Sequence, residues 1–116
     1  WEDLVLAGFD RTQRPNQAYP IFVDSVTGNF HSVGPSLATL QRNGSYAGPA
    51  SDFVFDTVAP TGTVALWPIT SKGEERVWRL APDRLEKDWV KGYIKISKNR
   101  RSGERNPFTF SIFQLA

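Results

Sequence analysis

The sequence contains no cysteine and no methionine, and it has a single histidine, His31. The lack of cysteine excludes disulfides, thiol nucleophiles and cysteine-ligated zinc. One histidine excludes histidine-rich metal sites and argues against a serine–histidine–aspartate triad. No apolar run is long enough to cross a bilayer, and no signal-peptide pattern occurs. Because a natural gene product starts with methionine, the start at Trp1 leads us to expect a piece cut from a longer protein.

The length and composition predict one domain covering residues 1–116. Apolar residues make up 40% of the chain and charged residues 22%, an ordinary composition for a globular domain. The net charge of +2 is unevenly distributed. Residues 91–116 hold six positive charges against one negative, a net +5, whereas residues 1–90 hold eight against eleven, a net −3. The basic end could attract a phosphate backbone, and the alternative is a solvated turn.

Alternating apolar residues and turn residues predict three β-hairpins. The first covers residues 19–33, the second joins 63–69 to 76–80, and the third covers 93–113 around a basic loop. Between the first two, residues 34–62 are interrupted by glycine and proline and predict a long loop excursion, with one short strand at 53–55. In the second hairpin the alternation points Val77 away from Trp78.

A helix is predicted at about residues 82–91. Pro82 suits the first helical position and Gly92 suits the position after the end, although Ala81 provides no side-chain cap. Leu85 and Trp89 are four residues apart, so they share the face that should pack on the sheet. The predicted fold is a small α+β domain, in which a mostly antiparallel sheet built from hairpins is covered by one helix.

The residues offer little for catalysis. Neither of the glycine-rich phosphate-binding motifs occurs, and no pair of carboxylates stands out by its spacing. His31 lies in a predicted strand without an orienting partner, which favours a surface or packed residue over a catalytic base. Tryptophans can stack on single-stranded bases, but Trp67, Trp78 and Trp89 fall where the pattern requires core. The sequence therefore predicts no catalytic, cofactor or metal-binding residue in this chain.

The third hairpin carries the best functional signal. A basic two-stranded ribbon can contact phosphates or enter a groove of DNA. The candidate DNA-binding residues are Lys91, Lys95, Lys98, Asn99, Arg100, Arg101 and Arg105. The positive residues are expected on phosphates, and Asn99 either bonds an adenine edge or serves as a turn residue. Arg76 and Arg79 alternate on one strand, either as a second positive row or as partners of Glu74, Glu75 or Glu86.

Two stretches of the chain resemble a known family when taken together. Residues 14–28 resemble the pattern RPN..YPI(Y/F)VD..TG, and residues 67–82 resemble PI...G.E..WR...P. Gly92-Tyr93-Ile94, followed by a basic segment, continues the same order. This order is similar to a region inside site-specific adenine-N6 DNA methyltransferases, including the modification subunits of type III restriction–modification systems.

The resemblance implies a role in target recognition for this middle region. In that family the region lies between a (D/N)PP(Y/F) catalytic motif and an F-x-G-x-G loop for S-adenosylmethionine. Residues 106–108 lack the second proline, and residues 6–9 lack the second glycine, so no catalytic or cofactor residue is carried over. S-adenosylmethionine is thus implied for the parent enzyme alone.

We therefore expect a non-catalytic DNA-binding domain of a bacterial, cytoplasmic adenine-N6 methyltransferase. The implied partners are double-stranded DNA, the remaining domains of the parent enzyme and a restriction subunit. The alternative is a structural spacer or dimerisation module of the same enzyme, marked by an exposed apolar patch. Candidates for such a patch are Phe53, Phe55 and Phe113. An independent small hydrolase would need a nucleophile with a positioned base, for which the chain offers only His31.

Overall fold

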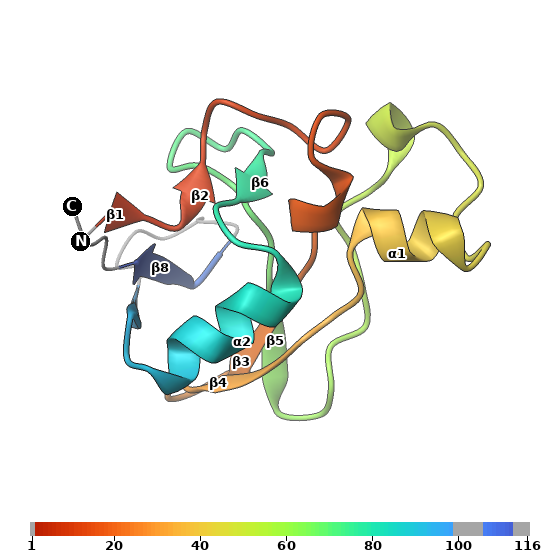
Figure 1. The fold of residues 1–116 in the computed structure, drawn as a ribbon. Helices are drawn as coiled ribbons and strands as arrows, with labels where there is room; N and C mark the ends of the chain where they lie inside the picture. Colours follow the sequence, from red (N-terminus) through yellow and green to blue (C-terminus); the bar gives the residue numbers. More distant parts are fainter. Residues whose placement is uncertain (1, 99–105, 113–116) are drawn as a thin grey trace.

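The computed structural model describes residues 2–98 and 106–112, whose strands form three small antiparallel sheets (Figure 1). The described strands are β1 (Glu2–Asp3), β2 (Val5–Leu6), β3 (Ile21–Asp24), β4 (Phe30–Val33), β5 (Thr63–Leu66), β6 (Val77–Trp78), β7 (Ile94–Lys98) and β8 (Phe108–Ile112). The first sheet has the strand order β1-β8-β7, the second pairs β2 with β6, and the third has the order β4-β3-β5. The α+β class is confirmed, with antiparallel pairing in all three sheets.

The main helix, α2, covers Pro82–Val90, within one residue of the predicted end. Ala81 stands at its N-terminus without a side-chain cap, and Gly92 follows its C-terminus with φ +77°. A φ in this range strains a residue with a Cβ, so glycine allows the chain to leave the helix and enter β7. Both observations agree with the sequence-based expectation.

One face of α2 packs on the β4-β3-β5 sheet, which it crosses in Figure 1. Leu85 is buried in the main core, and the Trp89 ring packs against Phe30 of β4 with 5.2 Å between ring centroids. The residues predicted to dock the helix therefore do so, although Trp89 stays half-buried. In the described part of the chain, no helix combines the length and apolar character needed to cross a membrane.

Segment 34–62 contains a second, short helix, α1 (Leu37–Arg42), and two 3₁₀ turns lie at Pro15–Gln17 and Ala50–Asp52. Ser36 caps α1, since its hydroxyl accepts a 3.2 Å hydrogen bond from the Thr39 N–H. The sequence analysis expected one helix and missed α1. The short strand expected at 53–55 is not formed: the Phe53 N–H bonds the Ala50 carbonyl and the Phe53 carbonyl accepts from Arg11. The side chains of Phe53 and Phe55 are buried in a second core.

The second predicted hairpin is wrong. Its strand β5 pairs with β3, and its strand β6 pairs with β2. The turn between them does form, with the Thr70 N–H donating to the Glu74 carbonyl at 2.9 Å and a single bridge joining Ile69 to Glu75. Beyond this bridge the two strands pair with other partners, although Leu66 with Trp78, and Trp67 with Val77, still share the two cores. The first and third hairpins are confirmed as β3–β4 and β7–β8.

Candidate nucleic-acid interface

The β7–β8 ribbon has one apolar and one polar face. Its register pairs Ile94 with Ile112, Ile96 with Phe110, and Lys98 with Phe108. The inward residues of β8 are buried in the main core. The alternate residues form what we call the polar face of the ribbon: Lys95, Ser97, Thr109 and Ser111. This arrangement is the expected one for an antiparallel ribbon with one face on the core and one in solvent.

Two of the predicted DNA-binding cations lie at the beginning of this ribbon, one just before β7 and one within it. Lys91 is exposed at the C-terminal end of α2, with its Nζ 5.9 Å from the centroid of the Tyr93 ring. Lys95 is exposed on the polar face, opposite Ser111. The structure therefore brings Lys91 and Lys95 to the start of the ribbon and directs both toward solvent.

The other predicted residues concentrate where the ribbon's strands are joined. Lys98 is the last residue of β7, and the chain returns at β8. Four predicted residues lie outside the described residues: Asn99, Arg100, Arg101 and Arg105. Phe113, a candidate for the alternative apolar patch, also lies outside them.

The start of β8 is attached to the rest of the domain by a contact that the sequence analysis missed. The side-chain amide of Asn106 donates to the Trp67 carbonyl at 2.7 Å, and its Oδ1 accepts from the Trp67 N–H at 3.3 Å. Two residues further on, the Phe108 ring packs against Gly28 in the β3–β4 turn. The sequence analysis considered residues 106–108 only as an incomplete methyltransferase motif, and the Asn-Pro pair after the basic loop was the only local signal.

The two arginines proposed as a second positive row, Arg76 and Arg79, are engaged in ion pairs. Arg76 bonds Glu74 at 3.0 Å, one of the partners the sequence suggested. Arg79 lies 3.5 Å from Glu2, a partner the sequence did not suggest, and its Nε also donates to the Asp3 carbonyl at 2.6 Å. These contacts favour the paired alternative over a second positive row.

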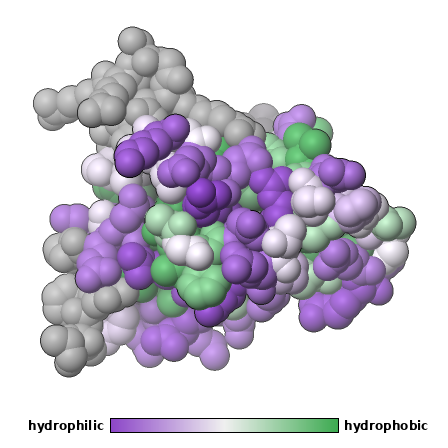
Figure 2. All heavy atoms as spheres, turned by 90° about the horizontal axis from the view of Figure 1, so that it is seen from above, coloured by the Kyte–Doolittle hydropathy of each residue, from purple (hydrophilic) through white to green (hydrophobic). Residues whose placement is uncertain are grey.

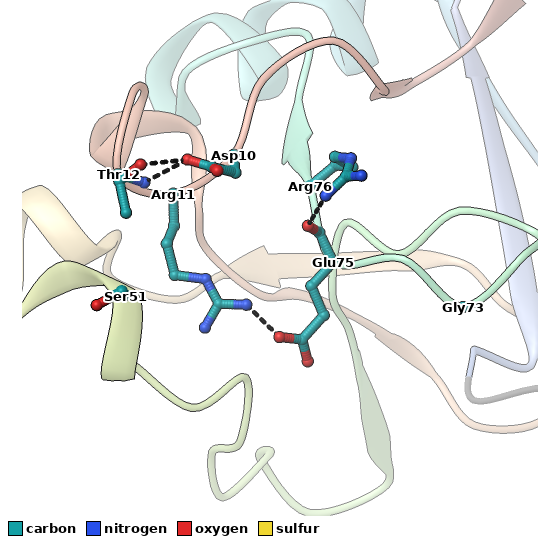
Figure 3. A pocket seen from close by; sticks show the side chains of 7 residues that line it. All are labelled: Asp10, Arg11, Thr12, Ser51, Gly73, Glu75 and Arg76. Atoms are coloured by element: carbon teal, nitrogen blue, oxygen red, sulfur yellow. Dashed lines mark hydrogen bonds and ion pairs between the residues drawn. The ribbon is translucent and has the colours of Figure 1, made fainter.

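An open hollow of about 500 Å³ lies where three loops meet (Figure 3). Its lining residues are Asp10, Arg11, Thr12, Ser51, Gly73, Glu75 and Arg76. The Arg11 guanidinium donates to the Glu75 carboxylate and to the Phe53 carbonyl, and it lies 4.1 Å from the centroid of the Phe55 ring. The Thr12 hydroxyl donates to Asp10 and so lowers the pKa of that carboxyl. The arginines of this hollow bond groups of the protein itself: Arg11 bonds Glu75 and Phe53, and Arg76 bonds the Glu75 carbonyl. We therefore interpret the hollow as a structural junction, a place where side chains join three loops.

The catalytic alternative gains no support from the surroundings of His31. Its side chain is exposed, and its Nδ1 lies 2.7 Å from the hydroxyl of the adjacent Ser32. Within residues 2–98 and 106–112, no three histidine, aspartate or glutamate side chains are grouped as metal ligands. The contact between His31 and Ser32 joins adjacent side chains of the short strand β4, which makes it a local surface hydrogen bond.

Two of the three phenylalanines proposed for an exposed apolar patch do not form one. Phe53 and Phe55 are buried in the second core, where the Phe55 ring stacks on Trp67 and the Phe53 ring meets Trp67 edge-on. The face in Figure 2 is largely hydrophilic, with its hydrophobic surface in separate areas. Comparison of the chain with family models, curated proteins and solved structures found no match.

Proposed function

We propose that this chain is a non-catalytic DNA-binding, target-recognition domain of an adenine-N6 DNA methyltransferase from a bacterial restriction–modification system. The observation that carries the proposal is the β7–β8 ribbon. Its polar face combines Lys95 with three hydroxyl side chains, and the segment joining its strands is the most basic part of the sequence. Lysine, serine and threonine are common donors to DNA phosphates.

The shape of the ribbon suits a DNA groove. The strand β1 pairs with β8 only at Ser111 and Ile112, so the part nearer the connection has two strands. A two-stranded antiparallel ribbon fits the major groove, which is about 12 Å wide. The inward face of β8 is anchored by Phe108, Phe110 and Ile112 in the main core, so the opposite face is presented outward. Amide and guanidinium groups at the ribbon's connection, from Asn99 to Arg105, supply the chemistry that pairs with base edges.

The charge distribution favours approach by this end of the molecule. Residues 1–90 carry a net −3, and four of their arginines form ion pairs with carboxylates: Arg11, Arg76, Arg79 and Arg84. Residues 91–116 carry a net +5. A polyanion is steered toward the end with unbalanced positive charge.

The packing of the aromatic residues favours duplex over single-stranded DNA. Single-strand binders stack bases on exposed aromatic side chains. Here Trp67 and Trp78 are buried, and Trp89 packs on Phe30. The polar face of the ribbon itself consists of lysine and hydroxyl side chains, which contact backbone rather than stack on bases.

The methyltransferase parent is proposed from the two resembling stretches, and their packing supports treating them as one unit. The indole Nε1 of Trp78 donates to the Tyr19 carbonyl at 2.7 Å, and the Gln17 side chain donates to the Trp78 carbonyl at 2.7 Å. Each stretch thus completes hydrogen bonds of the other in the interior. In the parent, S-adenosylmethionine and the catalytic motif belong to neighbouring segments, a restriction subunit is a further partner, and the enzyme acts in the cytoplasm.

The proposal is tested by charge reversal with a control of equal charge change. The variant Lys98→Glu/Arg100→Glu/Arg101→Glu alters the ribbon connection, and Arg14→Glu/Arg42→Glu/Lys72→Glu alters exposed cations elsewhere. Fluorescence anisotropy with a labelled duplex of mixed sequence measures affinity. We expect the first variant to lose binding and the second to keep most of it. Equal loss in both variants, or no binding by the unaltered chain, contradicts the proposal.

The spacer or dimerisation alternative predicts a different pair of results. It predicts that the unaltered chain does not bind DNA even at low salt and that its apparent mass rises with protein concentration. Light scattering across a concentration series, run beside the anisotropy titration, separates the two functions.

A further inference from the structure

The side chain of Asn106 makes the pair of main-chain hydrogen bonds that a neighbouring strand would make. Trp67 immediately follows β5, and both its main-chain N–H and its carbonyl are bonded to the Asn106 amide, at 3.3 and 2.7 Å. An amide side chain has one donor group and one acceptor group, so it can match the two main-chain groups of one residue. The contact spans 39 positions in the sequence.

A second contact fixes the same end of the ribbon. Gly28 is buried in the β3–β4 turn with φ +78°, and a Cβ built on it would lie 2.7 Å from the Phe108 ring. Only the missing side chain leaves room for this ring. The first residues of β8 are thus attached to β5 through Asn106 and to the β3–β4 turn through Phe108.

We infer that Asn106 is a positioning residue for DNA binding, which fixes the angle of the ribbon's polar face relative to the rest of the domain. The inference rests on the proposed function. Asn106 is separated by one residue from Phe108, which pairs with Lys98 and closes the ribbon. Because the ribbon is held at the end where its strands are joined, its lysine and hydroxyl groups are presented in a fixed arrangement, and less binding free energy is lost in ordering them.

The test compares two amide-to-alanine variants that break the same kind of bond. Gln17, like Asn106, donates from its side-chain amide to a tryptophan carbonyl at 2.7 Å, but its partner is Trp78 of β6, whereas that of Asn106 is Trp67. Neither Asn106→Ala nor Gln17→Ala changes the charge. Duplex affinity and its salt dependence are measured by anisotropy, well below the melting temperature of each variant, and stability is measured by thermal unfolding.

We expect Asn106→Ala to weaken duplex binding about fivefold, the cost of ordering one flexible side chain at the interface once the ribbon is no longer fixed. Its salt slope should fall in magnitude by about 0.9, as for one lost phosphate contact. Gln17→Ala should lose comparable thermal stability and keep the affinity and slope of the unaltered chain. If Asn106→Ala does not fold, Asn106→Ser, which keeps a polar atom at the site, carries the comparison.

Two failures are distinguishable. If the unaltered chain binds DNA through the ribbon while Asn106→Ala binds equally well, the positioning role is overturned and the proposed function stands. If the unaltered chain does not bind, or charge reversal on the ribbon has no effect, the proposed function is overturned and the inference falls with it.

Discussion

Val77 and Trp78 are neighbours in β6, yet their side chains are buried in two different hydrophobic cores. Successive side chains of a strand point to opposite faces, so this two-residue strand forms part of both cores. Val77 packs with Trp67 and the phenylalanines of segment 34–62, and Trp78 packs with Tyr19 in the main core. The strand β6 therefore contributes to both cores and connects the excursion with the rest of the domain, as the neighbours Leu66 and Trp67 also do.

Shortening Val77 should destabilise the protein through the second core. Val77 is fully buried, so Val77→Ala leaves a cavity and should lower the free energy of unfolding by about 2 kcal/mol. Val90→Ala removes the same atoms from a residue that is 85% exposed and should change stability little. Urea unfolding followed by tryptophan fluorescence measures both. Equal effects of the two variants would contradict the two-core description.

The Tyr19 hydroxyl should make stability depend on alkaline pH. It donates to the Leu80 carbonyl at 2.7 Å, and burial raises the pKa of Tyr19 above its ordinary value. A raised pKa in the folded state means that the contribution is complete below the unfolded tyrosine pKa of about 10 and declines as pH rises above it. Tyr19→Phe should lower stability at pH 7 by about 1 kcal/mol.

The pH profile separates this effect from simple loss of packing. Unfolding should be measured at intervals from pH 7 to above the ordinary tyrosine pKa for both proteins. The difference between the unaltered chain and Tyr19→Phe should shrink as pH rises past that value. A constant difference across the whole range would show that folding does not change the pKa of Tyr19.

The Arg11 guanidinium should contribute more to folding stability than the guanidinium groups of the other paired arginines. It bonds the Glu75 carboxylate and the Phe53 carbonyl and lies over the Phe55 ring, and its side chain is only 12% exposed. Arg11→Lys should lower the melting temperature, because an ammonium group cannot reproduce the planar guanidinium that bonds two acceptors. Arg76→Lys, at a more exposed pair, should have little effect. Thermal unfolding of both variants is the measurement, and tolerance of Arg11→Lys would argue against the junction.

A substitution at Gly28 tests the contact between the β3–β4 turn and Phe108 of the ribbon. Gly28→Ala places a Cβ against the Phe108 ring, whereas Gly73→Ala, at a similar φ of +83°, meets nothing within 4 Å. Both substitutions carry the strain of a positive φ, about 1 kcal/mol. Gly28→Ala should therefore be the more destabilising, and the excess measures the contact with Phe108. Similar melting temperatures for the two variants would mean that the ring moves aside freely.

The sequence predicts most of the elements whose signals are local. Helix α2 follows from Pro82 and Gly92, and the alternation in β8 places Phe108 and Phe110 correctly on the buried face. The buried positions of Trp67 and Trp78 also follow from the pattern. In these cases the residues that determine the structure are near one another in the chain.

The errors concern partners chosen by tertiary packing. The turn at 70–75 resembles that of a hairpin, but β5 and β6 pair with β3 and β2, which no local pattern specifies. Helix α1 was hidden by the glycine and proline before it, although the Ser36 cap was a usable signal. The Asn106 contact with Trp67 depends on a closure of the fold that the sequence does not display.

The sequence predicts which residues could bind DNA, but it does not indicate the contacts that hold the ribbon in place. The exposure of Lys91 and Lys95 agrees with the expectation, and the role of the remaining basic residues stays a prediction. The sequence could not indicate that four arginines of residues 1–90 are paired with carboxylates, since Arg11 and Glu75 are 64 positions apart. The net positive charge of residues 91–116 is visible in the sequence itself.

The most direct test of the central claim is the salt dependence of duplex binding by the unaltered chain. The logarithm of the association constant is plotted against the logarithm of the salt concentration, with a slope of about −0.9 for each phosphate contacted. Phosphate contacts by Lys95, Lys98 and Arg100 or Arg101 predict a slope of about −3. A slope near zero, or no binding at the lowest salt concentration, would contradict the account.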